Sequence, residues 1–438
     1  MKKQDFLELL NSLGINDKEL RTFSLETGFV QRVRKIDAVD FLYSLALESI
    51  RGTASYNDIA GAIEIENGTS VTRQAIWKKV TARCVNYFKF VLALVIIGKA
   101  DLHLYKGKSV KFKFNRILIQ DSTIVRLPRR LFELFSGVSN EYSQVCNARI
   151  QGIFDLVSGR FISFSIDPYS KNDLDSAPEL ELKKDDLTLR DRGYLTKNEI
   201  RRHVSCDAHF IYRYKIDMHL LDYETGEQLD ILSVLKERGS IDTLVRLNDR
   251  ERTVVRIIAK PVNQETADNR RRKAKKEMKG HCPSYLFLQL QSWTIFITTI
   301  PSNQADFEDI LYLYGFRWRI EIIFKCLKGN LNFDHIHNVS HNQLIIILMA
   351  RIIMFLIITQ IIYTPCNNLI NRHIKRNLSL LKLARYLNRH PEMFISILNE
   401  LLIYRGKLGR AMLAIARYCV YDKRKRQNFE QKFLTLFP

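Results

Sequence analysis

The sequence predicts an α/β protein, with one mixed sheet in the middle of the chain and helical regions before and after it. Two observations predict this class. Residues 1–108, and the residues from Asp306 onward, space their apolar side chains at three- and four-residue steps, as packed helices do. Between them lie short runs typical of strands. Apolar residues make up 46% of the 438-residue chain and charged residues 26%, the balance of a globular protein.

The charge of the chain indicates its kind of partner. Lys and Arg number 68 against 47 Asp and Glu, so the formal net charge is +21. A surplus of this size favours a polyanionic partner, most simply nucleic acid. The seven cysteines are scattered without a Cys-x-x-Cys pair, which is typical of a reducing cytosol. The N-terminal residues contain no unbroken apolar stretch, so we expect no signal peptide and a cytoplasmic, nucleoid-associated protein.

The N-terminal region contains a possible helix-turn-helix at residues 56–80. We expect a helix from Tyr56 to Ile65, a turn at Asn67-Gly68, and a second helix capped by Thr72. The second helix of such a motif enters the major groove of DNA, and here it carries Arg73, Lys78 and Lys79. Plain helical packing is an equally good interpretation, because two short helices around a glycine turn are common.

The predicted sheet begins near residue 112. We expect strands at 114–123, 148–159 and 160–168, then a helix at 176–184, a strand at 187–191, a helix at 196–204 and a strand at 208–215. Further strands follow at 243–247, 252–262, 285–290 and 292–300. This alternation predicts a mixed α/β arrangement around one sheet.

A dense basic run lies among the later strands, at residues 270–279. Its cationic side chains repel one another and need counter-charge, so contact with DNA phosphates is the favoured interpretation. A solvated basic surface is the alternative. The candidate phosphate-binding residues are Arg270, Arg271, Arg272, Lys273, Lys275 and Lys276.

Residues 344–363 are apolar enough to span a bilayer. However, the stretch contains Arg351, which would be costly in a lipid-exposed helix. We therefore predict a helix buried inside the protein, with a membrane span as the alternative.

The most informative segment is residues 311–331. On a single helix, one narrow face would carry Tyr314, Arg317, Glu321, Lys325 and Lys328, while the opposite side is apolar. An ordinary ion pair between Glu321 and Lys325 would explain two of these residues, but not the whole face.

Tyr-x2-Arg-x3-Glu-x6-Lys is the signature of a family of bacterial insertion-sequence transposases. Their Asp-Asp-Glu triad lies on a ribonuclease-H-like fold, which they share with retroviral integrases. The sequence matches the signature at Tyr314, Arg317, Glu321 and Lys328, and so resembles this family. The resemblance implies that Asp121, in ILIQDST, ends the first strand. It also implies that Asp191, in LTLRDRGY, ends the fourth strand, and that a β-strand insertion precedes the Glu321 helix.

The implied chemistry suits these residue types. Cleavage of a phosphodiester requires a positioned attacking oxygen and neutralised phosphate charge, which two divalent ions can provide. Hard cations such as Mg²⁺ prefer carboxylate oxygens. We therefore predict that Asp121, Asp191 and Glu321 hold Mg²⁺ or Mn²⁺, as two ions, and are catalytic.

The resemblance also implies roles around the triad. Tyr314, Arg317 and Lys328, with Lys325 on the same face, would hold phosphates of the transposon end. Trp293 would fill the gap left by a flipped-out base, as in family members that cut through a DNA hairpin. A core tryptophan on a strand is the alternative for Trp293.

We therefore predict a cut-and-paste DNA transposase that binds terminal inverted repeats and acts as a homodimer on double-stranded DNA, with no membrane partner. The rival hypothesis is a non-catalytic DNA-binding protein derived from a transposase. The predicted regions are 1–108, helical and DNA-binding; 109–217, the first part of the core; 218–302, a β-rich insertion; 303–365, the second part of the core; and 366–438, helical and dimerising.

Overall fold

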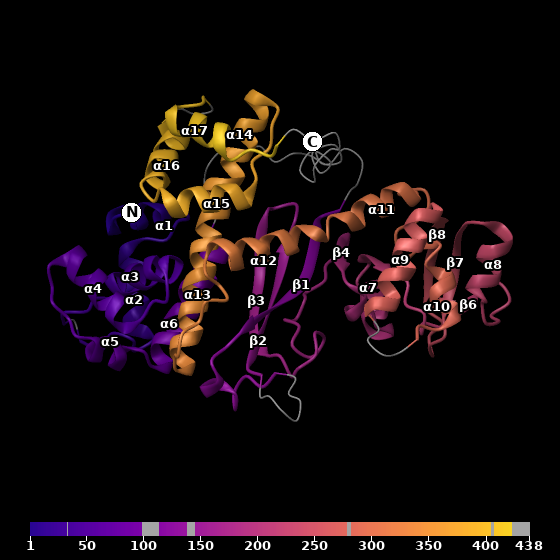
Figure 1. The fold of residues 1–438 in the computed structure, drawn as a ribbon, viewed down its shortest axis with the longest axis horizontal. Coiled ribbons are helices and arrows are strands. Elements are labelled where there is room, and N and C mark those ends of the chain that lie inside the picture. Colours follow the sequence, from indigo (N-terminus) through magenta and orange to yellow (C-terminus); the bar gives the residue numbers. More distant parts are fainter. Residues whose placement is uncertain (33, 99–113, 138–144, 278–281, 404–406, 423–438) are drawn as a thin grey trace.

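The computed structural model describes residues 1–32, 34–98, 114–137, 145–277, 282–403 and 407–422. Figure 1 shows a helical body at the N-terminal end, a central sheet crossed by a long helix, and a lobe at the far end of the sheet. The helices that follow residue 364 lie above the N-terminal body. The predicted α/β class, with helical regions flanking one mixed sheet, is confirmed.

The N-terminal body is helical, as predicted. Its helices are α1 (Lys3–Asn11), α2 (Asp17–Glu26), α3 (Ala38–Arg51), α4 (Tyr56–Asn67), α5 (Arg73–Lys79) and α6 (Ala82–Ile97). The predicted helix-turn-helix layout is present in α4 and α5. Gly68 ends α4 with a φ of 65°, a conformation that favours glycine, and the Thr72 side chain caps α5 by accepting the Ala75 N–H.

The described strands form one sheet, in the order β3-β2-β1-β4-β5-β9-β8-β7-β6. β1 pairs antiparallel with β2 and parallel with β4, and β4 pairs parallel with β5. The core strands are β1 (Arg116–Arg126), β2 (Asn147–Asp155), β3 (Arg160–Pro168), β4 (Asp186–Arg190) and β5 (His209–Arg213), with α7 (Lys197–Ser205) between the last two.

The predicted insertion extends this sheet rather than forming a separate one. β9 pairs antiparallel with both β5 and β8, which joins the lobe to the core strands. A second hydrophobic core fills the lobe and includes Phe210, Val255 and Ile297. The elements of the lobe are β6 (Leu220–Asp222), α8 (Ile231–Arg238), β7 (Ile241–Leu247), β8 (Val254–Pro261), α9 (Gln264–Glu277), α10 (Tyr285–Leu290) and β9 (Trp293–Thr298).

Two of the elements predicted in or beside the sheet are wrong. Residues 176–184 form no helix, because their polar groups bond to the neighbouring strands instead: the Ser165 hydroxyl donates to the Ser176 carbonyl at 3.1 Å. Residues 285–290 form the helix α10 rather than a strand. Ser284 caps that helix by accepting the Phe287 N–H, and a short apolar run alone does not distinguish a helix from a strand.

The described part of the C-terminal third is largely helical, as predicted, and residues 404–406 and 423–438 lie outside it. Its elements are α11 (Phe307–Gly315), α12 (Trp318–Asn330), α13 (His341–Ile357), a π-helical stretch (Ile358–Tyr363), α14 (Thr364–Ile374), α15 (Leu380–Arg389), α16 (Met393–Ile403) and α17 (Arg410–Tyr418). α12 packs on β1, while α13 packs on α3 and α6. Figure 1 shows α12 crossing the sheet and α13 standing between the sheet and the N-terminal body.

The apolar residues 344–363 form a helix buried inside the protein, which confirms that prediction. Among the described residues, His341–Ile374 is the single unbent helix long and apolar enough to cross a membrane, and 94% of its most apolar window is buried. Arg351 is fully buried at its centre. Its guanidinium donates to the carbonyls of Ser49, Gly52 and His335 at 2.8 to 3.1 Å, which offsets the cost of burial.

A buried histidine makes the stability of the fold depend on pH. His203 of α7 is fully buried, and its Nε2 lies 2.8 Å from the Thr188 hydroxyl. Burial lowers the pKa of His203 to about 4, against 6.5 for an unperturbed histidine. Below pH 6.5 the unfolded chain therefore binds a proton that the folded chain does not, so the free energy of unfolding falls as the pH falls.

We expect the His203 contribution to fall by about 2 kcal/mol between pH 7 and pH 5. Urea unfolding at both pH values measures it. His203→Gln should lose this part of the pH dependence, whereas the control His335→Gln, at a side chain 70% exposed, should keep it. An identical pH dependence in parent and His203→Gln would contradict the prediction.

Candidate active site

The two aspartates of the predicted triad lie at the same edge of the sheet. The parallel ladder of β1 and β4 ends with Gln120 opposite Arg190, so Asp121 and Asp191 are the next residue on each strand. Asp191 directly follows β4, as predicted. Asp121 does not end its strand, because β1 continues to Arg126 in its antiparallel ladder with β2. The prediction of a strand end at Asp121 is therefore wrong for β1 as a whole.

Glu321 lies in the first turn of α12. The segment 311–331 is not one helix, contrary to our expectation: α11 ends at Gly315 and α12 begins at Trp318. The N–H groups of Phe316 and Arg317 donate three residues back rather than four, to Leu313 and Tyr314, which tightens the chain at this point. The signature residues therefore come from two helices and the turn between them.

Arg317 connects the carboxylates of Asp121 and Glu321. Its guanidinium donates to Asp121 Oδ2 at 3.2 Å and to Glu321 Oε1 at 2.9 Å. The three side chains are 11%, 20% and 27% exposed, respectively, so these are partly buried ion pairs. Glu321 thus pairs with the residue four positions before it. Arg317, in the turn before α12, and Asp121 of β1 thus meet directly, although they lie 196 positions apart in the chain.

The electrostatics place Asp191 at the same site. The pKa of Asp121 is raised to about 6, mainly by burial and in smaller part by the negative charges of Glu321 and Asp191, while the Ser122 N–H and Arg317 oppose the shift. Asp121 and Glu321 therefore share Arg317 as a partner, and the charge of Asp191 acts on Asp121. Within the described ranges, no three His, Cys, Asp or Glu side chains are arranged to hold a metal ion.

The remaining signature residues border this cluster. Tyr314 is 8% exposed, and its ring lies 5.9 Å from the guanidinium of Arg317. Lys328, in the last turn of α12, donates to the Ile124 carbonyl of β1 at 2.7 Å, and burial lowers the pKa of this lysine. Lys325 is exposed. The structure thus brings Arg317 and Lys328 into contact with β1, while Tyr314 lies beside Arg317.

The sequence interpretation missed Arg213. This residue ends β5, and its guanidinium lies 5.2 Å from the Phe296 ring and 5.9 Å from the Tyr314 ring. Burial lowers the pKa of Arg213, and the charges of Arg270 and Arg192 lower it further. A basic residue at the end of the strand next to the Asp191 strand was the signal that could have identified it.

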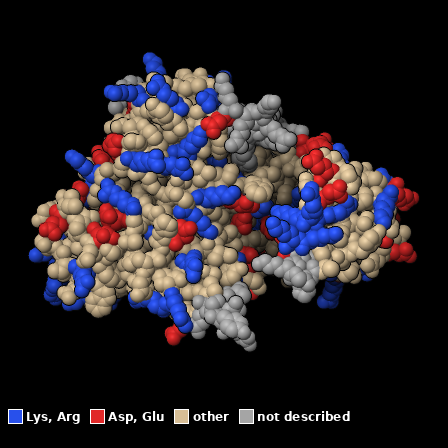
Figure 2. Space-filling view, viewed as in Figure 1, with Lys and Arg blue, Asp and Glu red and all other residues tan. Residues whose placement is uncertain are grey.

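The basic run lies on α9 and divides into two groups. Arg270 donates to the Trp293 carbonyl and Arg271 to the Leu288 carbonyl, at 3.0 and 3.2 Å, so these two guanidiniums hold α9 against β9 and α10. The exposed side chains are Arg272, Lys273, Lys275 and Lys276. Figure 2 shows a dense basic patch over α9, beside a hollow that separates the lobe from the body.

Trp293 is half-buried at the start of β9. Its indole N–H donates to the Gly239 carbonyl at 2.8 Å, and its ring packs on the core of the lobe. These are contacts of the kind a structural tryptophan makes. The base-flipping role predicted for Trp293 is untested by this arrangement.

The basic residues of the helix-turn-helix differ in how exposed their side chains are. Arg73 and Lys78 are exposed. Lys79 is half-buried, with its ammonium 5.5 Å from the centre of the Phe29 ring, and burial lowers its pKa. Contact of α5 with DNA stays a prediction for Arg73 and Lys78 above all.

The sheet order and the packing of α12 on β1 are those of a ribonuclease-H-like domain, with Asp121 and Asp191 on neighbouring strands and Glu321 on that helix. A family model described as the transposase DDE domain matches residues 112–357, more than half of the chain. The chain therefore belongs to the transposase DDE domain family, and it is a DDE-type transposase.

Three curated relatives match between 72% and 98% of the chain. The transposase for insertion sequence element IS231F of Bacillus thuringiensis subsp. israelensis is 22% identical, over 98% of this chain and 94% of its own length. The transposase for IS1151 of Clostridium perfringens is 22% identical, over 83% and 82%. The putative transposase InsL for IS186A of Escherichia coli K12 is 21% identical, over 72% and 83%.

Proposed function

We propose that this transposase binds the terminal inverted repeats of an insertion sequence, cleaves DNA at their ends and joins the freed 3′-hydroxyls to target DNA. The observation that carries the proposal is the convergence of Asp121 and Glu321 on one guanidinium, with Asp191 close enough to shift the pKa of Asp121. The protein would act as a dimer on two DNA ends, in the cytoplasm at the nucleoid.

The carboxylates fit divalent metal ions by their donor chemistry. Asp121 and Glu321 are partly buried, Asp191 is exposed, and the three negative groups have Arg317 as their neighbouring cation, an excess of negative charge that favours a divalent cation. We propose that Asp121, Asp191 and Glu321 hold Mg²⁺ or Mn²⁺, as two ions. When bound, the ions would neutralise phosphate charge and orient the attacking oxygen.

Arg317 and its neighbours would bind the DNA backbone. The Arg317 guanidinium already pairs with two carboxylates, and the same planar fork suits two oxygens of a phosphate. We propose that metal ions bind the carboxylates of Asp121 and Glu321 in place of Arg317. The Arg317 guanidinium then binds a DNA phosphate. The same DNA strand would be contacted by Tyr314, Lys325, Lys328 and Arg213.

The test begins with the DNA that flanks the gene, where inverted repeats identify the substrate. A labelled end carrying that repeat, incubated with the protein and Mg²⁺, should be nicked and then joined to a plasmid target. Binding of the repeat without any cleavage or joining would support the rival function, a DNA-binding protein that has lost catalysis.

Trp293 offers a test of the cleavage route. Trp293→Ala should slow hairpin formation by roughly 5- to 150-fold relative to first-strand nicking, the loss expected when about 1–3 kcal/mol of base stacking disappears. Nicked, hairpin and resolved products on a labelled end measure both steps.

Trp293→Phe provides the matched control, because it keeps a ring for stacking but removes the hydrogen bond to Gly239. Equal loss at both steps in Trp293→Ala, together with a lowered melting temperature, would show that the tryptophan serves the core of the lobe alone.

A further inference from the structure

A buried polar network lies behind β1, on the face of the sheet away from Asp121. Successive residues of a strand face opposite sides, so Ile119 and Asp121 face α12, whereas Leu118 and Ser122 face the other way. Ile119 joins the large core with α12, and Leu118 joins a separate small cluster with Ile153 and Leu180. The irregular segment 169–183 therefore covers the back of these strands.

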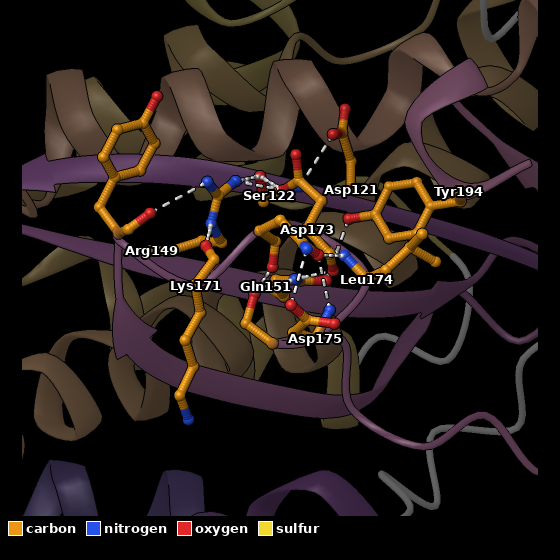
Figure 3. A network of polar contacts seen from close by, with 12 residues as sticks. Asp121, Ser122, Arg149, Gln151, Lys171, Asp173, Leu174, Asp175 and Tyr194 are labelled. Carbon is orange, nitrogen blue, oxygen red and sulfur yellow. Dashed lines mark hydrogen bonds and ion pairs between the residues drawn. The ribbon is translucent and has the colours of Figure 1, made fainter. Parts of the chain in front are cut away.

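The network starts at Asp121 itself. The Ser122 N–H donates to Asp121 Oδ1 at 2.8 Å, and the Ser122 hydroxyl donates to Asp173 Oδ1 at 2.6 Å. Arg149 of β2 forms an ion pair with Asp173 and donates to the Lys171 carbonyl at 3.1 Å. Figure 3 shows these contacts running from β1 into the covering segment.

A second branch reaches the network from Asp191. The Tyr194 N–H donates to the Asp191 carbonyl at 3.1 Å, which closes the turn that follows β4. The Tyr194 hydroxyl then donates to Gln151 Oε1 at 3.0 Å. Gln151 Nε2 donates to the Asp173 carbonyl at 2.6 Å and to the Ser176 hydroxyl at 2.8 Å. Gln151 also stands directly opposite Ser122 in the β1–β2 ladder.

The two branches meet inside the protein, where polar groups are costly unless they are bonded. Gln151 is 0% exposed and Tyr194 is 2% exposed. The Gln151 amide oxygen accepts one hydrogen bond and the amide nitrogen donates two. Only one orientation of the amide therefore satisfies its donors and its acceptor. Apolar residues of the same size would fill this space equally well, but they would not fix the direction of the Tyr194 turn.

We propose that Gln151 and Tyr194 are positioning residues, which hold the turn of Asp191 in register with β1 so that the carboxylates of Asp121 and Asp191 converge. The inference rests on the assignment of these two aspartates as metal ligands, proposed above. Neither Gln151 nor Tyr194 contacts the reacting atoms.

Tyr194→Phe is the most selective test, because it removes one hydroxyl and keeps the ring. With the DNA end bound, the Mn²⁺ concentration that half-saturates cleavage should rise about 3- to 10-fold, the factor that corresponds to one lost hydrogen bond. The rate at saturating Mn²⁺ should change less than about twofold, because the ligands themselves remain. Free Mn²⁺ measured by electron paramagnetic resonance should report the same loss of affinity without relying on activity.

The turn itself offers a second readout. Hydrogen exchange in a peptide covering residues 191–196 should be faster in Tyr194→Phe, while the melting temperature should fall by only a few degrees, as expected for one lost buried hydrogen bond. Gln151→Leu removes both links, so adding Tyr194→Phe to it should cause no further loss of Mn²⁺ affinity.

Tyr87→Phe is the matched control. Tyr87 of α6 is also fully buried, but its hydroxyl is without a hydrogen-bond partner among the described atoms, so its removal should leave Mn²⁺ affinity unchanged. A parent-like Mn²⁺ titration in Tyr194→Phe would overturn the inference, as would an equal shift in Tyr87→Phe. Cleavage by Asp121→Asn would instead overturn the proposed assignment of the triad, which separates the two failures.

Discussion

Asp121→Asn, Asp191→Asn and Glu321→Gln are each expected to reduce DNA cleavage by at least about 10²- to 10³-fold, the scale of losing one electrostatic stabiliser of the transition state. Each change keeps the size of the side chain but removes the charge that a divalent ion needs. Binding of the DNA end should persist, because most of that affinity comes from Lys and Arg contacts with phosphates. Cleavage of a labelled end and gel-shift titration measure the two properties on the same proteins.

A matched control is available on the same sheet. Asp155 lies at the end of β2 and is buried, and its carboxylate accepts the N–H groups of Ile117 and Val157 at 3.2 and 3.1 Å. Asp155→Asn should therefore lower stability, while cleavage by the folded fraction continues. Substantial cleavage by any of the three triad variants would contradict the assignment of that carboxylate.

Neutralising the exposed face of α9 is expected to change the salt dependence of DNA binding. Each lost phosphate contact removes about 0.9 from the slope of log affinity against log salt concentration, so four lost contacts remove about 3.6. The variant carries Gln at Arg272, Lys273, Lys275 and Lys276. Arg270 and Arg271 are left intact, because their guanidiniums hold backbone carbonyls of the lobe.

The control variant should lose the same total charge elsewhere. Four lysines whose ammonium groups already face a carboxylate are suitable, and they are changed to Gln together: Lys171, Lys183, Lys215 and Lys260. Titrations of a DNA end between about 50 and 200 mM salt give the slopes. If the α9 variant and the control variant have the same slope as the parent, the basic face of α9 does not contact phosphates.

Local patterns predicted most of the fold. Thr72 and Thr196 cap the helices expected after them, and β3 occupies the predicted range 160–168. The errors fall where local signals are ambiguous. The run at 285–290 is short and apolar, and the segment 176–184 takes its conformation from bonds to β2 and β3.

The candidate site was predictable in its residues but not in its arrangement. The spacing of Tyr314, Arg317, Glu321 and Lys328 predicted a single helix, whereas the structure divides these residues between α11, α12 and the turn that joins them. Asp121 and Asp191 followed from the resemblance. That Arg317 pairs with two carboxylates was not predictable, because one partner lies 196 residues away in the chain. Arg213 was missed for the same reason, since its significance depends on neighbours from other strands and helices.

The sequence by itself determined which groups are available: the three carboxylates, the signature cations, the positive surplus and the period of each helix and strand. The tertiary structure decided which of those side chains contact distant parts of the chain and which are exposed at the surface. It alone separates Arg270 and Arg271, which hold the lobe together, from the four exposed cations of α9. Helical and strand periods follow from local backbone geometry, whereas contacts between distant residues depend on sheet register and packing, which no local window of the chain contains.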